Sequence, residues 1–348
     1  MQDESQVPIA PLTTLRLGGP AARLITVTSG RELVDAIAEA DARSEPLLVL
    51  AGGSNVVVAD EGFAGTVVLV RTSGVSTLRD GTGAVRLTVQ AGEPWDALVA
   101  RCVADGLSGF EALSGIPGSV GGTPIQNVGA YGQEVAETIT TVRVYDRVAA
   151  EVVQLSNAEC GFAYRRSALK GSDRYAVLDV SFALTPERHG RALRYAELAA
   201  ALGEEIGGRA PLADVREAVL ALRRRKGMVL DPADPDTCSA GSFFTNPIVS
   251  AEELERLAGA DGARPPSWPA GADHVKTSAA WLIERAGFGR GYGHGPVGIS
   301  TKHTLALTNR GGATTADLLA LAREVRDGVC EAFGITLAAE PTLIGTTL

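Results

Sequence analysis

The sequence has little of what marks exported, metal-binding or membrane proteins. Its four cysteines (102, 160, 238 and 330) stand far apart without a Cys-x-x-Cys pair, which argues against a disulfide framework or a zinc site. The four histidines are not at metal-ligand spacing, so we expect no metal. No run approaches the roughly 18 apolar residues that span a bilayer, and the first ten residues lack the features of a signal peptide. We therefore expect a cytoplasmic protein without a membrane span.

Several common functional signatures are also missing. We find no Gly-x-Gly-x-x-Gly after a predicted strand, no Walker Gly-Lys-Ser/Thr, no His-Glu-x-x-His and no Gly-x-Ser-x-Gly. The net charge of −9, from 32 Lys and Arg against 41 Asp and Glu, opposes non-specific binding of nucleic acid, which needs clustered cations. The one basic run, residues 223–226, therefore needs a local explanation.

The residues that are present indicate an α/β protein with more than one subdomain. A chain of 348 residues exceeds the length at which a single core stops growing. Apolar spacing predicts a helix at 31–40 and a buried strand at 47–50, which ends at Gly52-Gly53. The same reasoning predicts strands at 67–70, 85–89, 141–145, 175–184 and 335–337, a helix that starts after Pro94, and helices at 213–225, 251–257, 277–286 and 314–333. Residues 109–132 are rich in Gly and Pro, which predicts a long functional loop without a regular helix.

Two glycine-rich segments are candidates for binding an anion. Residues 51–55 follow the predicted strand at 47–50, and residues 115–122 lie in the long loop. Each segment can present bare backbone N–H groups to phosphate oxygens, and two of them together indicate a diphosphate. The alternative is two sharp turns, and the residues alone leave the two interpretations about even.

Other candidate residues are ambiguous when each is taken alone. Ser242 precedes two phenylalanines, so its hydroxyl has an apolar wall suited to proton transfer away from water, but a turn serine is the commoner case. Arg165 can bind a carboxylate through two nitrogens or form a surface ion pair. Glu340, Tyr195 and Lys226 likewise have ordinary structural interpretations, as a solvated strand end, a core-edge aromatic and the cationic end of a helix.

Taken together, the motifs resemble those of the UDP-N-acetylenolpyruvoylglucosamine reductase (MurB) family of bacterial peptidoglycan synthesis. The combination of Ile-Pro-Gly, Gln-Asn-x-Gly-Ala-Tyr-Gly and Gly-Ser-Phe-Phe-x-Asn-Pro is specific, although no single motif is decisive. The matching stretches occur in family order across nearly the whole chain, at residues 14–19, 51–55, 114–118, 125–132, 164–165, 240–247, 280–283 and 337–345.

The resemblance implies an α/β fold of the vanillyl-alcohol-oxidase type that binds FAD, with an added α+β domain for the substrate. On this basis we expect a first FAD-binding subdomain at residues 1–72, a second at 73–230 and a substrate-binding domain at 231–334. A C-terminal strand within about 335–348 is expected to return to the flavin domains.

The resemblance also assigns roles to individual residues. The proton donor is expected at Ser242, with Arg165 and Glu340 as its charged catalytic partners. The residues expected to grip the substrate diphosphate are Tyr195, Lys226 and Asn246, and Tyr195 indicates the subtype that closes a tyrosine-bearing loop over the substrate. The residues expected to bind FAD are Gly52, Gly53, Ser54, Asn55, Gly115, Pro117, Gly118, Ser119, Thr123, Asn127 and Ala130.

The implied activity is NADPH-dependent reduction of the enolpyruvyl ether of UDP-N-acetylglucosamine to UDP-N-acetylmuramate. FAD is expected to be non-covalent, because Ser54 and Asn55 stand where covalent flavoproteins of this fold commonly place a histidine. We expect a UDP-sugar substrate, no nucleic-acid partner, and a monomer or weak oligomer. Two alternatives remain at this point: another flavin oxidase of the same fold, or a non-catalytic protein that binds a nucleotide sugar.

Overall fold

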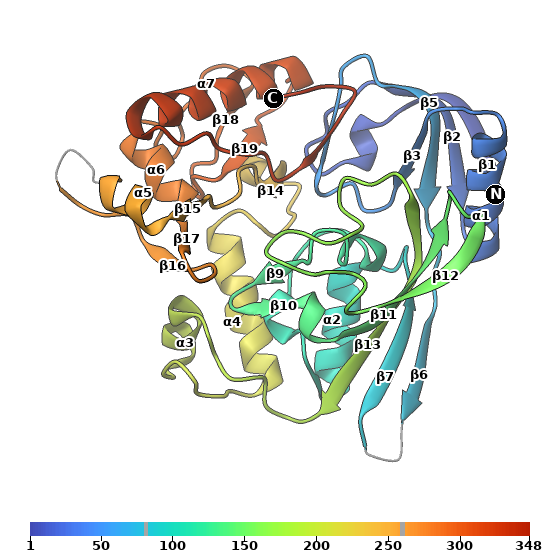
Figure 1. The fold of residues 1–348 in the computed structure, drawn as a ribbon, viewed down its shortest axis with the longest axis horizontal. Coiled ribbons are helices and arrows are strands. Elements are labelled where there is room, and N and C mark those ends of the chain that lie inside the picture. Colours follow the sequence, from blue (N-terminus) through green and yellow to red (C-terminus); the bar gives the residue numbers. More distant parts are fainter. Residues whose placement is uncertain (80–82, 258–261) are drawn as a thin grey trace. The chain divides into compact units, whose positions relative to one another are not determined.

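The computed structural model describes residues 1–79, 83–257 and 262–348 (Figure 1). Contacts divide the chain into two compact units. Unit 1 comprises residues 1–7, 21–53 and 63–229, and unit 2 comprises residues 8–20, 54–62 and 230–348. This division concerns compactness alone, so the expected domain boundaries at 72, 230 and 334 stay predictions.

Unit 1 contains a small sheet with parallel pairing. Its strands lie in the order β1 (Gln2–Pro8), β2 (Pro20–Val27), β5 (Phe63–Val70) and β3 (Leu47–Leu50), and β5 pairs in parallel with both β2 and β3. Helix α1 (Gly30–Ala42) connects β2 to β3. It begins at Ser29, whose side chain accepts a hydrogen bond from Glu32 N, and its apolar side around Leu33 and Ile37 is buried.

A larger antiparallel sheet forms the rest of the framework of unit 1. Its strands lie in the order β12 (Glu151–Ser156), β11 (Ile139–Asp146), β13 (Tyr175–Pro186), β7 (Val85–Gln90) and β6 (Val75–Arg79), and the short β8 (Leu107–Ser108) also pairs with β13. In β7, Val85, Leu87 and Val89 are buried and alternate with more exposed residues. This period of two places one face of the sheet on the core.

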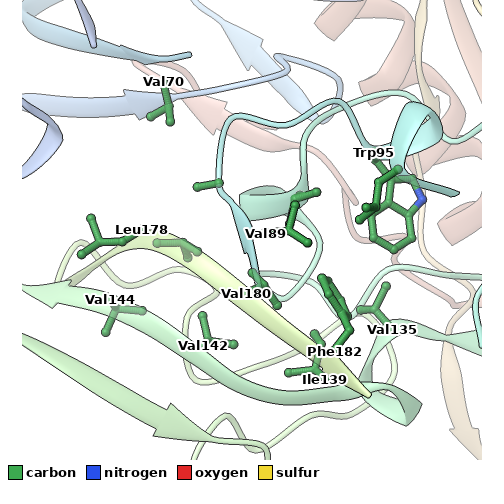
Figure 2. Packing of buried hydrophobic residues seen from close by; sticks show 14 of the residues in the cluster. Val70, Val89, Trp95, Val135, Ile139, Val142, Val144, Leu178, Val180 and Phe182 are labelled. Carbon is green, nitrogen blue, oxygen red and sulfur yellow. The ribbon is translucent and has the colours of Figure 1, made fainter. Parts of the chain in front are cut away.

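Aromatic packing joins the long loop to this sheet. Trp95 opens α2 (Trp95–Ala104), and Figure 2 shows it with Phe182 of β13; the two ring centroids lie 6.1 Å apart. The Trp95 ring centroid lies 5.1 Å from that of Phe110 in the loop. The Phe110 ring in turn lies 5.5 Å from the ring of Phe182 on β13. Trp95 also donates a hydrogen bond from Nε1 to the carbonyl of Leu113 at 3.1 Å, which satisfies its polar atom. The start of the loop is thereby fixed to the core of unit 1.

The remaining elements of unit 1 are short, apart from one helix. The loop at 109–132 contains the 3₁₀ turns η2 (Glu111–Leu113) and η3 (Val120–Gly122), and its last part forms β9 (Gly129–Ala130), which pairs with β10 (Gln133–Glu134). The turn η4 (Val135–Glu137) follows. Helices α3 (Ala196–Leu202) and α4 (Leu212–Arg225) pack against each other, and α4 also contacts α2.

In its described residues, unit 2 has three small sheets and three helices. The first sheet has the strand order β14 (Ser239–Ser242), β19 (Ala306–Asn309) and β18 (Val297–Ile299). The second has the order β15 (Ile248–Ser250), β17 (His274–Thr277) and β16 (Ser267–Pro269). The third is the parallel pair of β20 (Thr342–Ile344) and β4 (Val56–Val58). The helices are α5 (Ala251–Arg256), α6 (Ala279–Arg285) and α7 (Thr315–Phe333), and the 3₁₀ turns are η1 (Ala10–Leu12) and η5 (Pro235–Thr237).

Most predicted elements are confirmed, and one is wrong. Among the described residues, helices cover the predicted segments at 31–40, 213–225 and 314–333 apart from terminal residues, and strands cover those at 47–50, 85–89 and 175–184. The predicted strand at 335–337 is not formed, and the pairing occurs later, in β20. Leu337 is buried in the core of unit 2, so its apolar character reflects packing in irregular chain. No described helix is long and apolar enough to cross a membrane.

Candidate active site

The two glycine-rich segments of unit 1 lie in direct contact. A Cβ atom added to Gly52 would lie 2.4 Å from Gly118 Cα, so only glycine allows this approach. Gly53, Gly115 and Gly118 have φ values of +58°, +72° and +118°, in the region that favours glycine. The structure therefore brings together the two loops that the sequence analysis identified separately, with bare backbone at their meeting point.

A buried hydroxyl beside Gly118 fits a polar ligand. Ser119 is 7 % exposed, and among the described residues its Oγ has no hydrogen-bond partner within the chain. The carbonyl of the neighbouring Gly118 is taken by Trp95 N at 3.1 Å. Buried polar atoms are nearly always paired, so an unpaired hydroxyl next to a glycine cradle is the arrangement expected where a bound phosphate-bearing group completes the site.

Asn127, another residue expected to bind FAD, uses its side chain to join the loop to neighbouring segments of unit 1. Its Nδ2 donates to Glu134 Oε2 at 2.7 Å and to the carbonyl of Ala163 at 3.1 Å, and its Oδ1 accepts from Ala136 N at 3.2 Å. Asn127 is 1 % exposed and has a φ of +47°. Its amide thus sets the shape of the loop. Thr123 similarly donates from Oγ1 to the carbonyl of Val120 at 2.8 Å.

Arg165 is attached to the same loop. Its Nη2 donates to the carbonyl of Gly129 at 2.9 Å, and its guanidinium carbon lies 5.4 Å from the centre of the Tyr164 ring. Arg165 also has a left-handed backbone, with a φ of +52°. Its place is therefore set by β9, which is continuous with the loop that carries the predicted FAD-binding residues.

Two of the predicted catalytic residues, Ser242 and Glu340, lie together in unit 2. Ser242 ends β14, and Glu340 N donates to the carbonyl of the next residue, Phe243, at 2.8 Å. Asn55 Nδ2 donates to the carbonyl of Glu340 at 3.4 Å, and Asn55 accepts from Thr342 N at 3.0 Å. Glu340 is 8 % exposed. A hydroxyl and a largely buried carboxylate thus come from segments about a hundred residues apart in the chain, whereas Arg165 belongs to unit 1.

The predicted substrate residues Tyr195 and Lys226 gather in unit 1 around Tyr131. The Tyr131 and Tyr195 rings meet edge to face with centroids 5.4 Å apart, and Lys226 Nζ lies 5.8 Å from the centre of the Tyr131 ring. Lys226 Nζ also forms an ion pair with Glu197 Oε2 at 2.6 Å. Burial raises the pKa of Tyr131 to about 12, so its phenol is neutral at physiological pH. The third substrate residue, Asn246, lies in unit 2, where its Oδ1 accepts from Ala279 N at 3.0 Å.

Sequence reasoning gave no individual role to three charged or aromatic residues of this cluster, although Tyr131 lies in a matching motif and Arg223 in the basic run. Tyr131 stands in the Gly-Ala-Tyr-Gly motif, and Glu197 follows Tyr195 by two residues, so proximity to predicted site residues was the available signal. Arg223 is 6 % exposed, and burial lowers the pKa of its guanidinium to about 10. A Cβ at Gly115 would lie 3.4 Å from Arg223 Nε, so this cation adjoins the glycine loop.

The described residues offer no cluster of three or more His, Cys, Asp or Glu side chains placed to hold a metal ion. The four cysteines are free thiols. Burial raises the pKa of Cys102 to about 12 and that of Cys160 to about 11, so both stay protonated and act as small apolar groups.

Comparison with known proteins identifies the family. Residues 21–156 match the FAD binding domain family, and residues 232–344 match the family described as UDP-N-acetylenolpyruvoylglucosamine reductase, C-terminal domain. The reductase of that name from Thermobifida fusca is 64% identical over 348 residues, covering 98% of both chains, and the one from Streptomyces coelicolor is 58% identical, covering 100% of this chain and 92% of its own. The crystal structure of the MurB reductase from Thermus caldophilus is 26% identical, with a TM-score of 0.66 over 99% of this chain and 98% of that one.

These findings confirm the resemblance inferred from the motifs, as well as the mixed α/β fold with a FAD-binding domain. The match extends over almost the entire chain, in agreement with the order of motifs in the sequence. The chain belongs to the UDP-N-acetylenolpyruvoylglucosamine reductase (MurB) family.

Proposed function

We propose that this protein uses FAD and NADPH to reduce the enolpyruvyl ether of UDP-N-acetylglucosamine to UDP-N-acetylmuramate, a precursor of peptidoglycan. The observation that carries this proposal is the pairing of the Glu340 segment with the residue after Ser242. It holds the backbone of a residue with a carboxylate next to the chain that carries a hydroxyl, which supports a protonation step away from bulk water. The names of the relatives support the same reaction.

The residues present fit FAD. Gly52, Gly53, Gly115 and Gly118 supply a backbone cradle, and Ser119 supplies a buried hydroxyl at its edge. Bound FAD contributes hydride-transfer chemistry. Attachment is non-covalent in this proposal, since Ser54 and Asn55, which follow the paired glycines, offer no histidine for a covalent link.

The chain's own residues manage the charge and the proton. Hydride addition to the terminal carbon of the enolpyruvyl group moves an electron pair onto the adjacent carbon and its carboxylate. The guanidinium of Arg165 holds that carboxylate and offsets the developing charge. Ser242 Oγ then gives its proton to the adjacent carbon, and Glu340 orients the hydroxyl and assists its reprotonation. One hydride and one proton therefore convert the double bond to a single bond.

Tyr195, Lys226 and Asn246 hold the diphosphate of the substrate in this proposal. The ring contacts around Tyr131 already place the Tyr195 side chain and the Lys226 ammonium in one cluster. A phenol and an ammonium both donate hydrogen bonds to phosphate oxygens. The basic run at 223–226 thus has a local role that agrees with a protein of net charge −9.

The decisive experiment removes the proton donor. Ser242→Ala should leave anaerobic reduction of the bound flavin by NADPH unchanged, while reoxidation by the enolpyruvyl substrate slows by about 10²- to 10⁴-fold, the usual value of a placed proton donor. Stopped-flow absorbance of the flavin separates the two half-reactions. Thr245→Val is the matched control, because it removes a nearby hydroxyl that donates to the Ala338 carbonyl at 3.4 Å and has no role in the proposed reaction. Equal slowing of both half-reactions would refute the assignment, as would a purified wild-type protein without flavin absorbance.

The proposal includes a cytoplasmic location and a monomeric or weakly associating enzyme without a nucleic-acid partner. Four free thiols and the acidic net charge support it. Light scattering during size-exclusion chromatography tests the oligomeric state, and a stable oligomer at micromolar concentration would overturn that part.

A further inference from the structure

The segment that leads into Tyr195 is tied down by backbone hydrogen bonds. Gly190 N donates to the carbonyl of Ala210 at 2.8 Å, and Leu193 N donates to the carbonyl of Gly208 at 2.9 Å. These bonds join residues 190–193 to the chain that runs into α4. They fix the base of the segment. At its end, the Tyr195 carbonyl accepts from Leu198 N at 3.1 Å and Ala199 N at 3.0 Å at the start of α3, so the direction of the Tyr195 side chain depends on side-chain contacts.

A buried carboxylate anchors the same base. Glu111 is 1 % exposed, and its Oε1 accepts from Arg191 N at 2.7 Å and from Gln133 Nε2 at 2.8 Å. Its Oε2 accepts from Gly109 N at 2.8 Å. Because this carboxylate receives three hydrogen bonds in a buried place, it fixes the position of Arg191 to that of the long loop.

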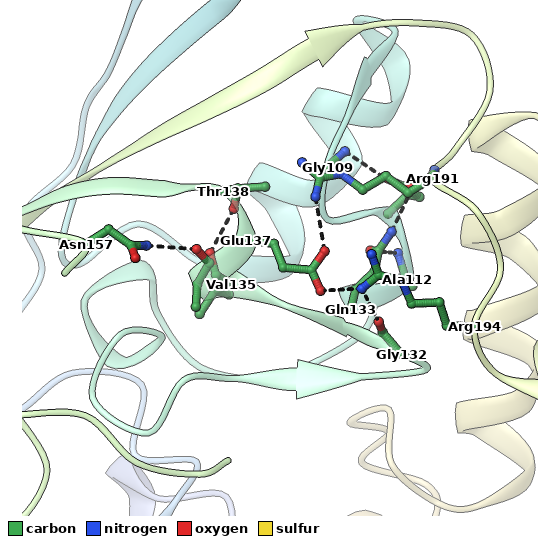
Figure 3. Close-up of polar contacts among 12 residues, drawn as sticks. Gly109, Ala112, Gly132, Gln133, Val135, Glu137, Thr138, Asn157, Arg191 and Arg194 are labelled. Carbon is green, nitrogen blue, oxygen red and sulfur yellow. Dashed lines mark hydrogen bonds and ion pairs between the residues drawn. The ribbon is translucent and has the colours of Figure 1, made fainter. Parts of the chain in front are cut away.

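A second carboxylate, that of Glu137, forms ion pairs with both Arg191 and Arg194 (Figure 3). Its Oε2 lies 3.1 Å from Arg191 Nη1, and its Oε1 lies 2.9 Å from Arg194 Nη1. The Glu137 side chain is only 25% exposed, compared with 30% for Arg191 and 59% for Arg194. Each oxygen serves one arginine, so the carboxylate spans the segment from its base to the residue before Tyr195.

The ion pair between Glu137 and Arg194 affects Tyr195, because Arg194 is the residue before it in the chain. A Cβ at Gly132 would lie 2.7 Å from Arg194 Cβ, so the Arg194 stem rests directly on the backbone of Gly132. The adjoining residues, Tyr131 and Tyr195, make the edge-to-face ring contact. Tyr195 itself is 40% exposed, and a single exposed ring contact is weak, so the grip on Arg194 contributes to holding the phenol in place.

We propose that Glu137 is a positioning residue, which holds residues 191–194 against the long loop and thereby presents Tyr195 to the substrate diphosphate. The inference rests on the diphosphate-binding role of Tyr195 in the proposed function. Glu137 does not touch the reacting atoms, so its loss weakens substrate binding without changing the chemical step.

Steady-state kinetics of Glu137→Gln test the consequence for binding. The two carboxylate oxygens of Glu137 serve different arginines, and in Gln one of them becomes an NH2 group that cannot accept a hydrogen bond, so the segment loosens. KM for the enolpyruvyl substrate should rise about 2- to 10-fold, while kcat stays within about twofold, since two partly exposed ion pairs are weakened. Glu255→Gln is the matched control, because it breaks an exposed Glu–Arg pair with Arg264 in unit 2 and changes the net charge equally.

Hydrogen exchange tests the positioning without relying on catalysis. Peptides covering residues 188–196 should exchange faster in Glu137→Gln than in the wild type or in Glu255→Gln, with peptides from α4 unchanged. Unchanged exchange in this peptide would overturn the inference, and so would an unchanged KM or a fall in kcat alone. If the wild-type protein does not reduce the substrate, the proposed function fails, but the exchange comparison still decides whether Glu137 holds the segment.

Discussion

Glu197 forms an ion pair with Lys226, the cation that binds the substrate diphosphate in the proposed function. Its Oε2 lies 2.6 Å from Lys226 Nζ, and Lys226 in turn lies above the Tyr131 ring. A diphosphate that binds Lys226 must displace this carboxylate or share the ammonium with it. Replacing Glu197 by Gln removes the competing charge with little change in volume. We therefore expect Glu197→Gln to bind the substrate more tightly.

The size of this effect follows from the geometry. Two unit charges 2.6 Å apart attract each other by about 1.6 kcal/mol in a water-like dielectric. The two side chains are 30% and 39% exposed, and measured values for such pairs fall to about 0.2–1 kcal/mol because of screening and side-chain entropy. At about 1.4 kcal/mol for each factor of ten, the upper part of that range corresponds to a KM lower by about 2- to 5-fold.

The assay is the dependence of the initial rate on the concentration of the enolpyruvyl substrate at saturating NADPH. The double variant Glu197→Gln/Lys226→Ala is the control, because the gain should vanish once the ammonium is absent. If KM rises in Glu197→Gln, the carboxylate orients Lys226 for binding instead of competing with the substrate, and the reasoning is refuted. The same conclusion follows if the gain persists in the double variant.

Two further predictions concern the glycine loops and the Tyr131 phenol. Gly52→Ala puts a Cβ 2.4 Å from Gly118 Cα, so the purified protein should lose FAD absorbance and melt at a lower temperature, whereas Gly122→Ala, with no atom within 4 Å of the new Cβ, should keep its flavin. Retention of full FAD by Gly52→Ala would contradict the contact between the loops. The pKa of Tyr131 is raised by burial to about 12, from about 10 when unfolded, so its neutral form stabilises the fold fully below pH 10 and loses that effect as the pH rises towards 12. Between pH 9 and 11, urea unfolding should show the wild type losing on the order of 1 kcal/mol more stability than Tyr131→Phe, and equal losses would contradict this.

Local patterns in the sequence predicted most elements, because the periodicity of apolar residues reports which side of a helix or strand is buried. Helix α1 and strand β13 are examples, with Leu33 and Ile37 on one side of the helix and near-continuous burial along the strand. The predicted strand at residues 335–337 was wrong, since an apolar run indicates burial in the same way whether or not the backbone pairs. Leu337 is buried without belonging to a strand.

The candidate site was predicted less completely, because its contacts join residues far apart in the chain. Glu137 lies 54 and 57 positions from its two arginine partners, and no local pattern encodes such a pairing. Asn127 shows that a motif does not determine the contacts of each of its side chains. The motif placed it among the residues expected to bind FAD, whereas its side-chain amide bonds Glu134, Ala136 and Ala163, beyond the end of the loop. A motif thus identifies a segment that matters without saying which of its side chains face the ligand.

Glu137 and Glu197 both lie near Tyr195, and comparing their variants tests the specific contacts more strictly than either variant does alone. Glu137→Gln and Glu197→Gln each change the net charge from −9 to −8, so a general electrostatic effect on an anionic substrate would lower KM in both. The structure predicts opposite signs, since Glu137 fixes arginines that carry the Tyr195 segment and Glu197 neutralises the ammonium of Lys226. A rise in KM for the first variant with a fall for the second is the result that these specific contacts predict, and a change of overall charge does not produce it. If KM shifts in the same direction for both variants, the change in overall charge accounts for both results, and the two specific roles are refuted.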